Sequence, residues 1–163
     1  MKFLKSLLVS VAFIAAASSA NAANYNWGVL SDGDSYEEYT VSAGDFLDTI
    51  TFTIGQESVA DFGAGVLNVV VGKKQFQFIE NLAVSLFDVE DNQLGSGLNF
   101  TVDTLTAGTY TLKITGFAKG TLAEAGKYGV GVTIAAVPEP SSVAMLLVGF
   151  AALGAVARRR KTL

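Results

Sequence analysis

The chain has 163 residues, contains neither cysteine nor histidine, and carries a net charge of −4 at pH 7. The missing residue types exclude disulfide bonds, thiol chemistry and every nucleophilic site that needs a histidine base. Zinc would have only carboxylates as ligands, and general acid–base catalysis would have to use carboxylates too.

Residues 1–22 have the pattern of a secretory signal helix. Lys2 and Lys5 supply a positive start, Leu7–Ala17 is apolar, and Ala20-Asn21-Ala22 has the small residues of a cleavage site. An uncleaved N-terminal anchor is the alternative, which the short apolar stretch and the small residues disfavour. We therefore predict cleavage by the secretion machinery after Ala22, with Ala20 and Ala22 as the recognised residues.

Residues 23–137 make up a segment of 115 residues, long enough for one domain with its own core. This segment carries 14 acidic residues and five lysines, a net charge of about −9. A surface this acidic repels nucleic acid and anionic lipid, so we expect no nucleic-acid partner. It suits a soluble secreted domain or one that binds divalent cations.

Alternation of apolar and polar residues predicts about eight β-strands in this segment. In Phe46–Ile54, for example, Ile50, Phe52 and Ile54 share one face and three threonines share the other. The remaining predicted strands are Tyr25–Leu30, Tyr36–Val41, Gly65–Val71, Asn81–Asp88, Leu98–Val102, Thr109–Phe117 and Lys127–Ile134. One apolar face per strand predicts an all-β fold, a single antiparallel β-sandwich or jelly roll.

Two acidic loops are candidate calcium sites, because Ca²⁺ takes six to eight oxygen ligands. One loop offers Asp32 and Asp34, and the other offers Asp88, Glu90 and Asp91. Neither has the spacing of the twelve-residue EF-hand loop. Asp, Asn and Gly also belong in turns for backbone reasons, so solvated turns are the alternative. No cofactor other than calcium is indicated.

The side chain of Asp48 is in phase with the apolar Ile50 and Phe52, so it should face the core. We expect loop N–H groups to satisfy this carboxylate in a structural role. No pair of acids of the kind used in glycoside hydrolysis stands out, so we expect no catalytic residue and no enzyme. Four aromatic residues have two interpretations, core packing or stacking on sugar rings: Tyr25, Trp27, Tyr36 and Tyr39.

The segment Leu105–Gly116, followed by Gly126–Val132, resembles the closing hairpin of bacterial pre-peptidase C-terminal-type sandwiches. These are jelly-roll domains appended to secreted proteins. In such a hairpin Ala107-Gly108 would make the turn into a strand, and Tyr110 and Tyr128 would fill the core on neighbouring strands.

The end of the chain has a three-part pattern. Val137-Pro138-Glu139-Pro140 precedes the apolar run Val143–Ala157, and the basic cluster Arg158-Arg159-Arg160-Lys161 follows it. The prolines place the start of a helix after Pro140. The run is near the short limit for crossing a bilayer, and the cluster would stay in the cytoplasm. We predict a transmembrane helix at 143–157.

Residues 138–163 resemble the PEP-CTERM sorting signal of Gram-negative bacteria, which a membrane-embedded exosortase recognises. Phe46–Phe52 is similar to the Phe-x-Asp-x-Phe-Thr-Phe signature of one PEP-CTERM subfamily, with Ile50 in place of the middle aromatic residue. A plain single-pass anchor is the alternative. A buried helix of a globular domain would show a polar face, which this run lacks.

The resemblance implies a non-enzymatic surface or matrix protein with exosortase as its partner. Such a protein crosses the inner membrane, is held there by its tail for a time, and ends at the cell surface or in the extracellular matrix. The family's setting adds exopolysaccharide and biofilm as expected surroundings. A surface module that binds carbohydrate or calcium is the alternative function.

Overall fold

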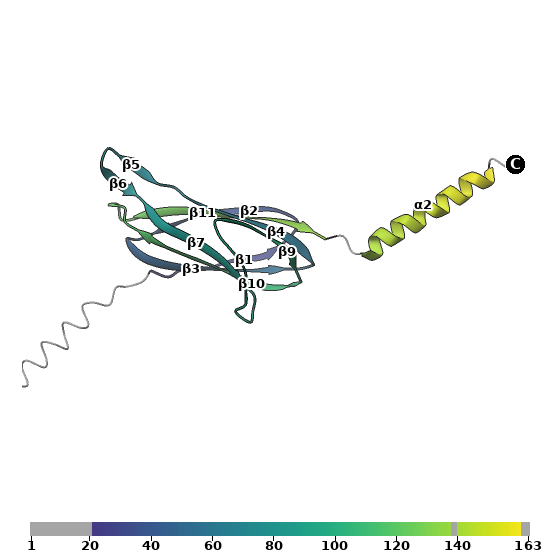
Figure 1. The fold of residues 1–163 in the computed structure, drawn as a ribbon, viewed down its shortest axis with the longest axis horizontal. Helices are drawn as coiled ribbons and strands as arrows, with labels where there is room; N and C mark the ends of the chain where they lie inside the picture. The colour runs from purple at the N-terminus through teal and green to yellow at the C-terminus, as the bar shows by residue number, and fades with distance from the viewer. Residues whose placement is uncertain (1–20, 138–139, 161–163) are drawn as a thin grey trace, which may run out of the picture.

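The computed structural model describes residues 21–137 and 140–160 (Figure 1). The signal segment up to Ala20, and Pro138, Glu139 and Lys161 of the tail, lie outside the described residues. Two sheets face each other across one core, and a separate helix follows them (Figure 1).

Eleven strands make up the described part of the sandwich segment. They are β1 (Asn24–Leu30), β2 (Gly33–Val41), β3 (Gly44–Ile54), β4 (Ser58–Val66), β5 (Val69–Val71), β6 (Lys74–Gln77), β7 (Ile79–Phe87), β8 (Gln93–Ser96), β9 (Asn99–Leu105), β10 (Gly108–Ala118) and β11 (Gly126–Ala136). One sheet has the order β1-β3-β10-β7-β8, the other has β2-β11-β4-β9, and β5 and β6 form a separate hairpin. The predicted all-β sandwich is therefore found, with more strands than the eight expected.

One strand pair departs from the antiparallel prediction, because β1 pairs with β3 in parallel. The chain passes from β1 to β2 in the other sheet and then back to β3, with short turns between them. Each turn reverses the chain, and two reversals restore its direction. The other pairs in both sheets are antiparallel.

The predicted strand Gly65–Val71 is wrong. Strand β4 ends at Val66, Leu67 and Asn68 follow, and the short β5 belongs to the projecting hairpin. The residues expected to share a buried face, Leu67, Val69 and Val71, are 51%, 38% and 64% exposed. Most of β4 was missed because small residues occupy much of its inward face, where Ser58 and Ala60 precede Phe62.

The core is built from the faces that alternation predicted. Ile50, Phe52 and Ile54 of β3 are at most 1% exposed. Phe52 stacks on Tyr110 of β10 in the same sheet, with the ring centroids 5.9 Å apart, and contacts Phe62 of β4 on the facing sheet at 6.1 Å. Tyr110 and Tyr128 are both buried, as predicted, but they lie on opposite sheets. The expected hairpin between β10 and β11 is therefore absent: β10 pairs with β3 and β7, and β11 with β2 and β4.

The tail contains one helix, α2 (Pro140–Arg160), so the predicted helix is confirmed. Within the described residues, no helix is both long and apolar enough to cross a membrane. That finding corrects the prediction of a transmembrane helix at 143–157. The apolar run of 15 residues rises only about 23 Å, short of the roughly 30 Å of a hydrocarbon core.

Candidate functional site

A shallow groove crosses the outer face of the β2-β11-β4-β9 sheet, and glycines make its floor. Strand register places Gly131 between Tyr36 and Gly63, and Gly129 between Glu38 and Gly65. The Tyr36 ring covers Gly129 and Gly131, and two open hollows of about 300 and 420 Å³ lie on this face. We call this surface, floored by Gly63, Gly65, Gly129 and Gly131, the glycine groove.

Tyr36 stands in the glycine groove and lines both hollows. Its side chain is 64% exposed. An edge of its ring rests on the glycines, since a Cβ added at Gly129 would lie 2.2 Å from the Tyr36 hydroxyl oxygen. That hydroxyl donates to Glu38 Oε1 across 3.2 Å. Desolvation, and then the hydrogen bond to Glu38, raise the pKa of Tyr36.

Carboxylates and hydroxyl groups border the groove. Register aligns Asp34, Thr133, Asp61 and Thr101 in one row across four strands. Thr133 donates to Asp34 Oδ1 across 2.6 Å, and Thr101 donates to Asp61 Oδ1 across 2.5 Å. Each carboxylate has further lone pairs that can accept hydrogen bonds. The site therefore combines an exposed aromatic ring with acceptors for hydroxyl or ammonium donors.

A lysine and a glutamate form an ion pair beside the groove. Lys127 pairs with Glu38, and this pairing lowers the pKa of Glu38 and raises that of Lys127. Both side chains line the smaller hollow. Because Lys127 is engaged by Glu38, the net charge around the groove is negative.

Sequence reasoning left four aromatic residues with two interpretations, and the structure separates them. Tyr39 is buried, while Tyr25 and Trp27 pack partly buried against the core. Trp27 Nε1 donates to Tyr39 Oη across 2.7 Å. Tyr36 is the member of the set that borders the groove. The sequence does contain a Gly-x-Gly pattern on β4 and another on β11, which could have indicated the groove. Only the strand register shows that Gly63 and Gly65 lie beside Gly131 and Gly129.

The two acids predicted for the first calcium loop have separate partners, since Asp32 lies in the turn after β1 and Asp34 lies on β2. Asp32 Oδ1 accepts a hydrogen bond from the backbone N–H of Ala136 across 3.2 Å, whereas Asp34 accepts from Thr133. Among residues 21–137 and 140–160, no three acidic side chains gather as a metal ion would require.

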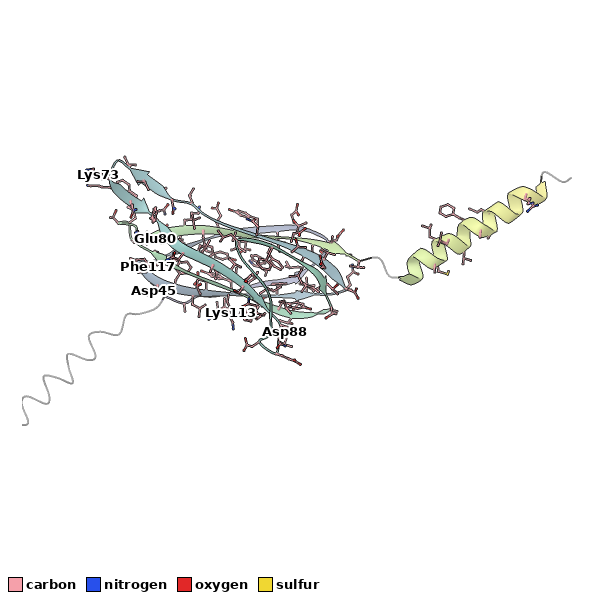
Figure 2. The ribbon with its side chains drawn as sticks, viewed as in Figure 1. Asp45, Lys73, Glu80, Asp88, Lys113 and Phe117 are labelled. Carbon is pink, nitrogen blue, oxygen red and sulfur yellow. The ribbon has the colours of Figure 1, made fainter. Side chains whose placement is uncertain are left out.

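The loop between β7 and β8, where Asp88 is labelled in Figure 2, is closed by its own hydrogen bonds. Asp88 Oδ1 accepts from the backbone N–H groups of Glu90 and Asn92, at 2.8 and 2.9 Å. The side chain and backbone of Asn92 lower the pKa of Asp88. Asp91 pairs instead with Lys113, at 2.8 Å. The predicted calcium ligands Asp88, Glu90 and Asp91 are thus not assembled into one set.

Asp48 is buried as predicted, with 2% of its surface exposed. Its Oδ1 accepts a hydrogen bond from the backbone N–H of Ala23 across 2.9 Å, and its Oδ2 accepts from Tyr128 Oη across 2.6 Å. One expected loop N–H is therefore present, and a tyrosine on the facing sheet is the second donor.

The tail joins the sandwich at the end of β11. Val137 N donates to the carbonyl of Glu57 across 3.0 Å, which ties the last residue before Pro138 to the start of β4. Helix α2 begins three residues later. Six of its large apolar side chains are 59–73% exposed: Met145, Leu146, Leu147, Val148, Phe150 and Leu153. Arg158 is exposed too. An apolar helix that ends in a basic cluster thus follows a short link.

Residues 136–161 match the family model of the PEP-CTERM protein-sorting motif. The PEP-CTERM motif therefore contains the predicted sorting residues Val137, Pro138, Glu139, Pro140, Arg158, Arg159 and Arg160. No curated protein sequence matches the chain.

Several solved structures are similar to part of this chain. The periplasmic g-type lysozyme inhibitor PliG of Aeromonas hydrophila is 12% identical, over 70% of this chain and 99% of that one, with a TM-score of 0.43. The pre-peptidase C-terminal domain of a Bacillus anthracis collagenase is 17% identical, over 72% and 99%, with a TM-score of 0.42. A mutant PliG of Escherichia coli is 16% identical, over 70% and 99%, with a TM-score of 0.38.

Proposed function

We propose that this chain is an exported, non-enzymatic surface protein that exosortase processes at the PEP-CTERM tail. The match over residues 136–161 carries the proposal. The structure supports it by placing that tail after a complete sandwich, on an apolar helix whose described side chains remain exposed. In this proposal the tail holds the chain at the inner membrane of a Gram-negative bacterium until it is removed, and the sandwich reaches the surface or matrix.

Mass spectrometry of the mature C-terminus tests this proposal. The chain is produced in two otherwise identical strains, one with an exosortase and one without. We expect the protein from the first strain to lack α2 and the protein from the second to end at Leu163. An intact C-terminus in both strains would contradict exosortase processing.

We propose a second role for the sandwich, the binding of a glycan in the glycine groove. A pyranose ring has a C–H face, which the negative π-face of Tyr36 attracts, and a rim of hydroxyl groups that Asp34 and Asp61 can accept from. The carboxylates favour neutral or ammonium-bearing sugars and repel anionic ones. In this role the glycine groove is the surface that contacts the exopolysaccharide.

Thermal-shift titration with three oligosaccharides tests glycan binding. We expect glucosamine hexamers to raise the melting temperature most, cellohexaose less, and oligomannuronate not at all. Tyr36→Ala should abolish the shift, whereas Phe117→Ala should preserve it. Phe117 is a matched control because it is 39% exposed and lies on the opposite sheet. Equal shifts for both variants, or no shift with any sugar, would contradict this role.

A further inference from the structure

Asp48 is a buried carboxylate whose two donors are both neutral. They are the amide of Ala23 and the hydroxyl of Tyr128. The ion pairs of the described residues involve other acids, namely Asp91, Glu80 and Glu38. A charge removed from water is costly unless an opposite charge compensates it. Within residues 21–137 and 140–160, this buried acid therefore has no ion-pair partner.

Signal-peptide removal would change the chemistry of one of those donors. Hydrolysis of the Ala22–Ala23 bond consumes one water, leaves a carboxylate on Ala22, and leaves the Ala23 nitrogen as a free amine. An α-amine has an ordinary pKa of about 7.7–8.0, so at pH 7 it is mostly an ammonium ion. The nitrogen that becomes charged is the atom already 2.9 Å from Asp48 Oδ1.

We propose that removal of the signal peptide supplies the missing counter-charge, because the new Ala23 ammonium forms an ion pair with the buried Asp48 carboxylate. This inference rests on the export contained in the proposed function and on the cleavage after Ala22 that the sequence predicts. The mature domain is then more stable than its precursor, and it gains that stability only once the leader has been removed.

The backbone around Ala23 holds the new terminus in place. The carbonyl of Ala23 accepts a hydrogen bond from Thr49 N across 2.8 Å, and β1 continues from Asn24 along β3. Ala22 is exposed and Ala23 is half-buried. Cleavage gives up the two backbone bonds of Asn21, to Asp45 and Leu47. The bonds of Asn21 are separate from the bond between Thr49 N and the Ala23 carbonyl, so cleavage leaves Ala23 bonded to β3.

Neutral tyrosines surround the proposed pair. Burial and then the nearby charge of Asp48 raise the pKa of Tyr25 of β1 and of Tyr128 of β11. The ring centroid of Tyr39 of β2 lies 5.4 Å from that of Tyr128. Burial raises the pKa of all three, so none carries a competing charge at pH 7. A low-dielectric environment strengthens an ion pair that forms within it.

A double-mutant cycle on the chain Ala23–Leu163, released from a removable fusion and kept in detergent, tests the pairing. Acetylation of the Ala23 amine restores a neutral amide, as in the precursor. We expect acetylation to lower the melting temperature of the wild-type chain and to leave that of Asp48→Asn unchanged. An equal effect in both backgrounds, or no effect in the wild type, would overturn the proposal.

Amine reactivity gives a second measurement that does not depend on the Asp48 variant folding. An acylating reagent attacks the free amine, so a paired ammonium should react roughly ten-fold more slowly, the effect of about one unit in pKa. The control chain begins at Asn21, two residues further out. Equal rates in the two chains would overturn the pairing. N-terminal sequencing of the exported protein tests cleavage separately, and a mature chain beginning at another residue would overturn the premise.

Discussion

Tyr128 of one sheet donates its hydroxyl hydrogen to the buried carboxylate of Asp48 on the other, across 2.6 Å. Tyr128 is 1% exposed and Asp48 is 2% exposed, so neither group can turn to water. The ring of Phe46, also on the Asp48 strand, stacks on Tyr128 with the centroids 5.6 Å apart. This polar link therefore sits inside an aromatic contact between the sheets.

Tyr128→Phe should destabilise the domain because it removes a donor and leaves Asp48 Oδ2 buried without a partner. An unsatisfied buried acceptor costs about 1–3 kcal/mol, and more when it is charged. Urea unfolding at pH 7 measures the loss. The control is Tyr36→Phe, which removes an exposed hydroxyl and should change the free energy of unfolding very little. Similar losses for the two variants would contradict the special role of Tyr128.

The free energy of unfolding at alkaline pH should depend on the same Tyr128 hydroxyl. Burial, followed by the hydrogen bond to Asp48, raises the pKa of Tyr128 well above its ordinary value of 10.0. The folded state then keeps a proton that the unfolded state releases. This contribution is complete below pH 10 and is lost as the pH rises further. By pH 11 each such tyrosine lowers the free energy of unfolding by at most about 1.4 kcal/mol.

Denaturant unfolding from pH 8.5 to 11 tests this dependence. Burial also raises the pKa of Tyr39, which adds to the same loss. We therefore expect Tyr128→Phe to flatten the alkaline decline without abolishing it. An identical decline in the variant and the wild type would show that Tyr128 does not titrate differently in the two states.

Gly120 shows where a glycine is needed for space. A Cβ added there would lie 2.1 Å from the carbonyl oxygen of Ala125 and 2.4 Å from that of Phe76. Backbone atoms cannot step aside cheaply, so Gly120→Ala should cost about 1–3 kcal/mol. Gly65→Ala is the matched control because nothing lies within 4 Å of its added Cβ. Urea unfolding should separate the two variants, and equal stabilities would contradict the close approach.

The sequence was sufficient for the all-β class and for the sorting motif of the tail because both depend on local patterns. Alternation identified the inward face of β3, and the prolines, apolar run and arginines identified the tail. The parallel pairing of β1 was not predictable, since two sheet-crossing turns set it. The sequence pattern predicted a strand at Gly65–Val71 and missed most of β4, which begins at Ser58. Small residues such as Ser58 and Ala60 face inward on β4, so its apolar alternation is weak.

The candidate sites were less predictable because they depend on contacts between distant strands. Asp48 could be placed toward the core from its phase with Ile50, but its partner Tyr128 lies 80 residues further along. The glycine groove needs the register of β11 against β2 and β4. A single sequence does not give that register, so Tyr36 could not be separated from Tyr39.

Replacement of the Pro-Glu-Pro triplet should block processing without unfolding the sandwich. The core ends with β11, and Val137 is bonded to Glu57 at the start of β4. Changing Pro138, Glu139 and Pro140 together to alanine leaves those contacts in place. Because alanine favours helix, α2 could then extend toward the sandwich. In a strain with exosortase we expect full-length protein to accumulate with an unchanged melting temperature. The control is Ser142→Ala, which leaves the triplet intact and should be processed normally. If mass spectrometry shows the triple variant losing α2 as the wild type does, the triplet is not the recognised feature.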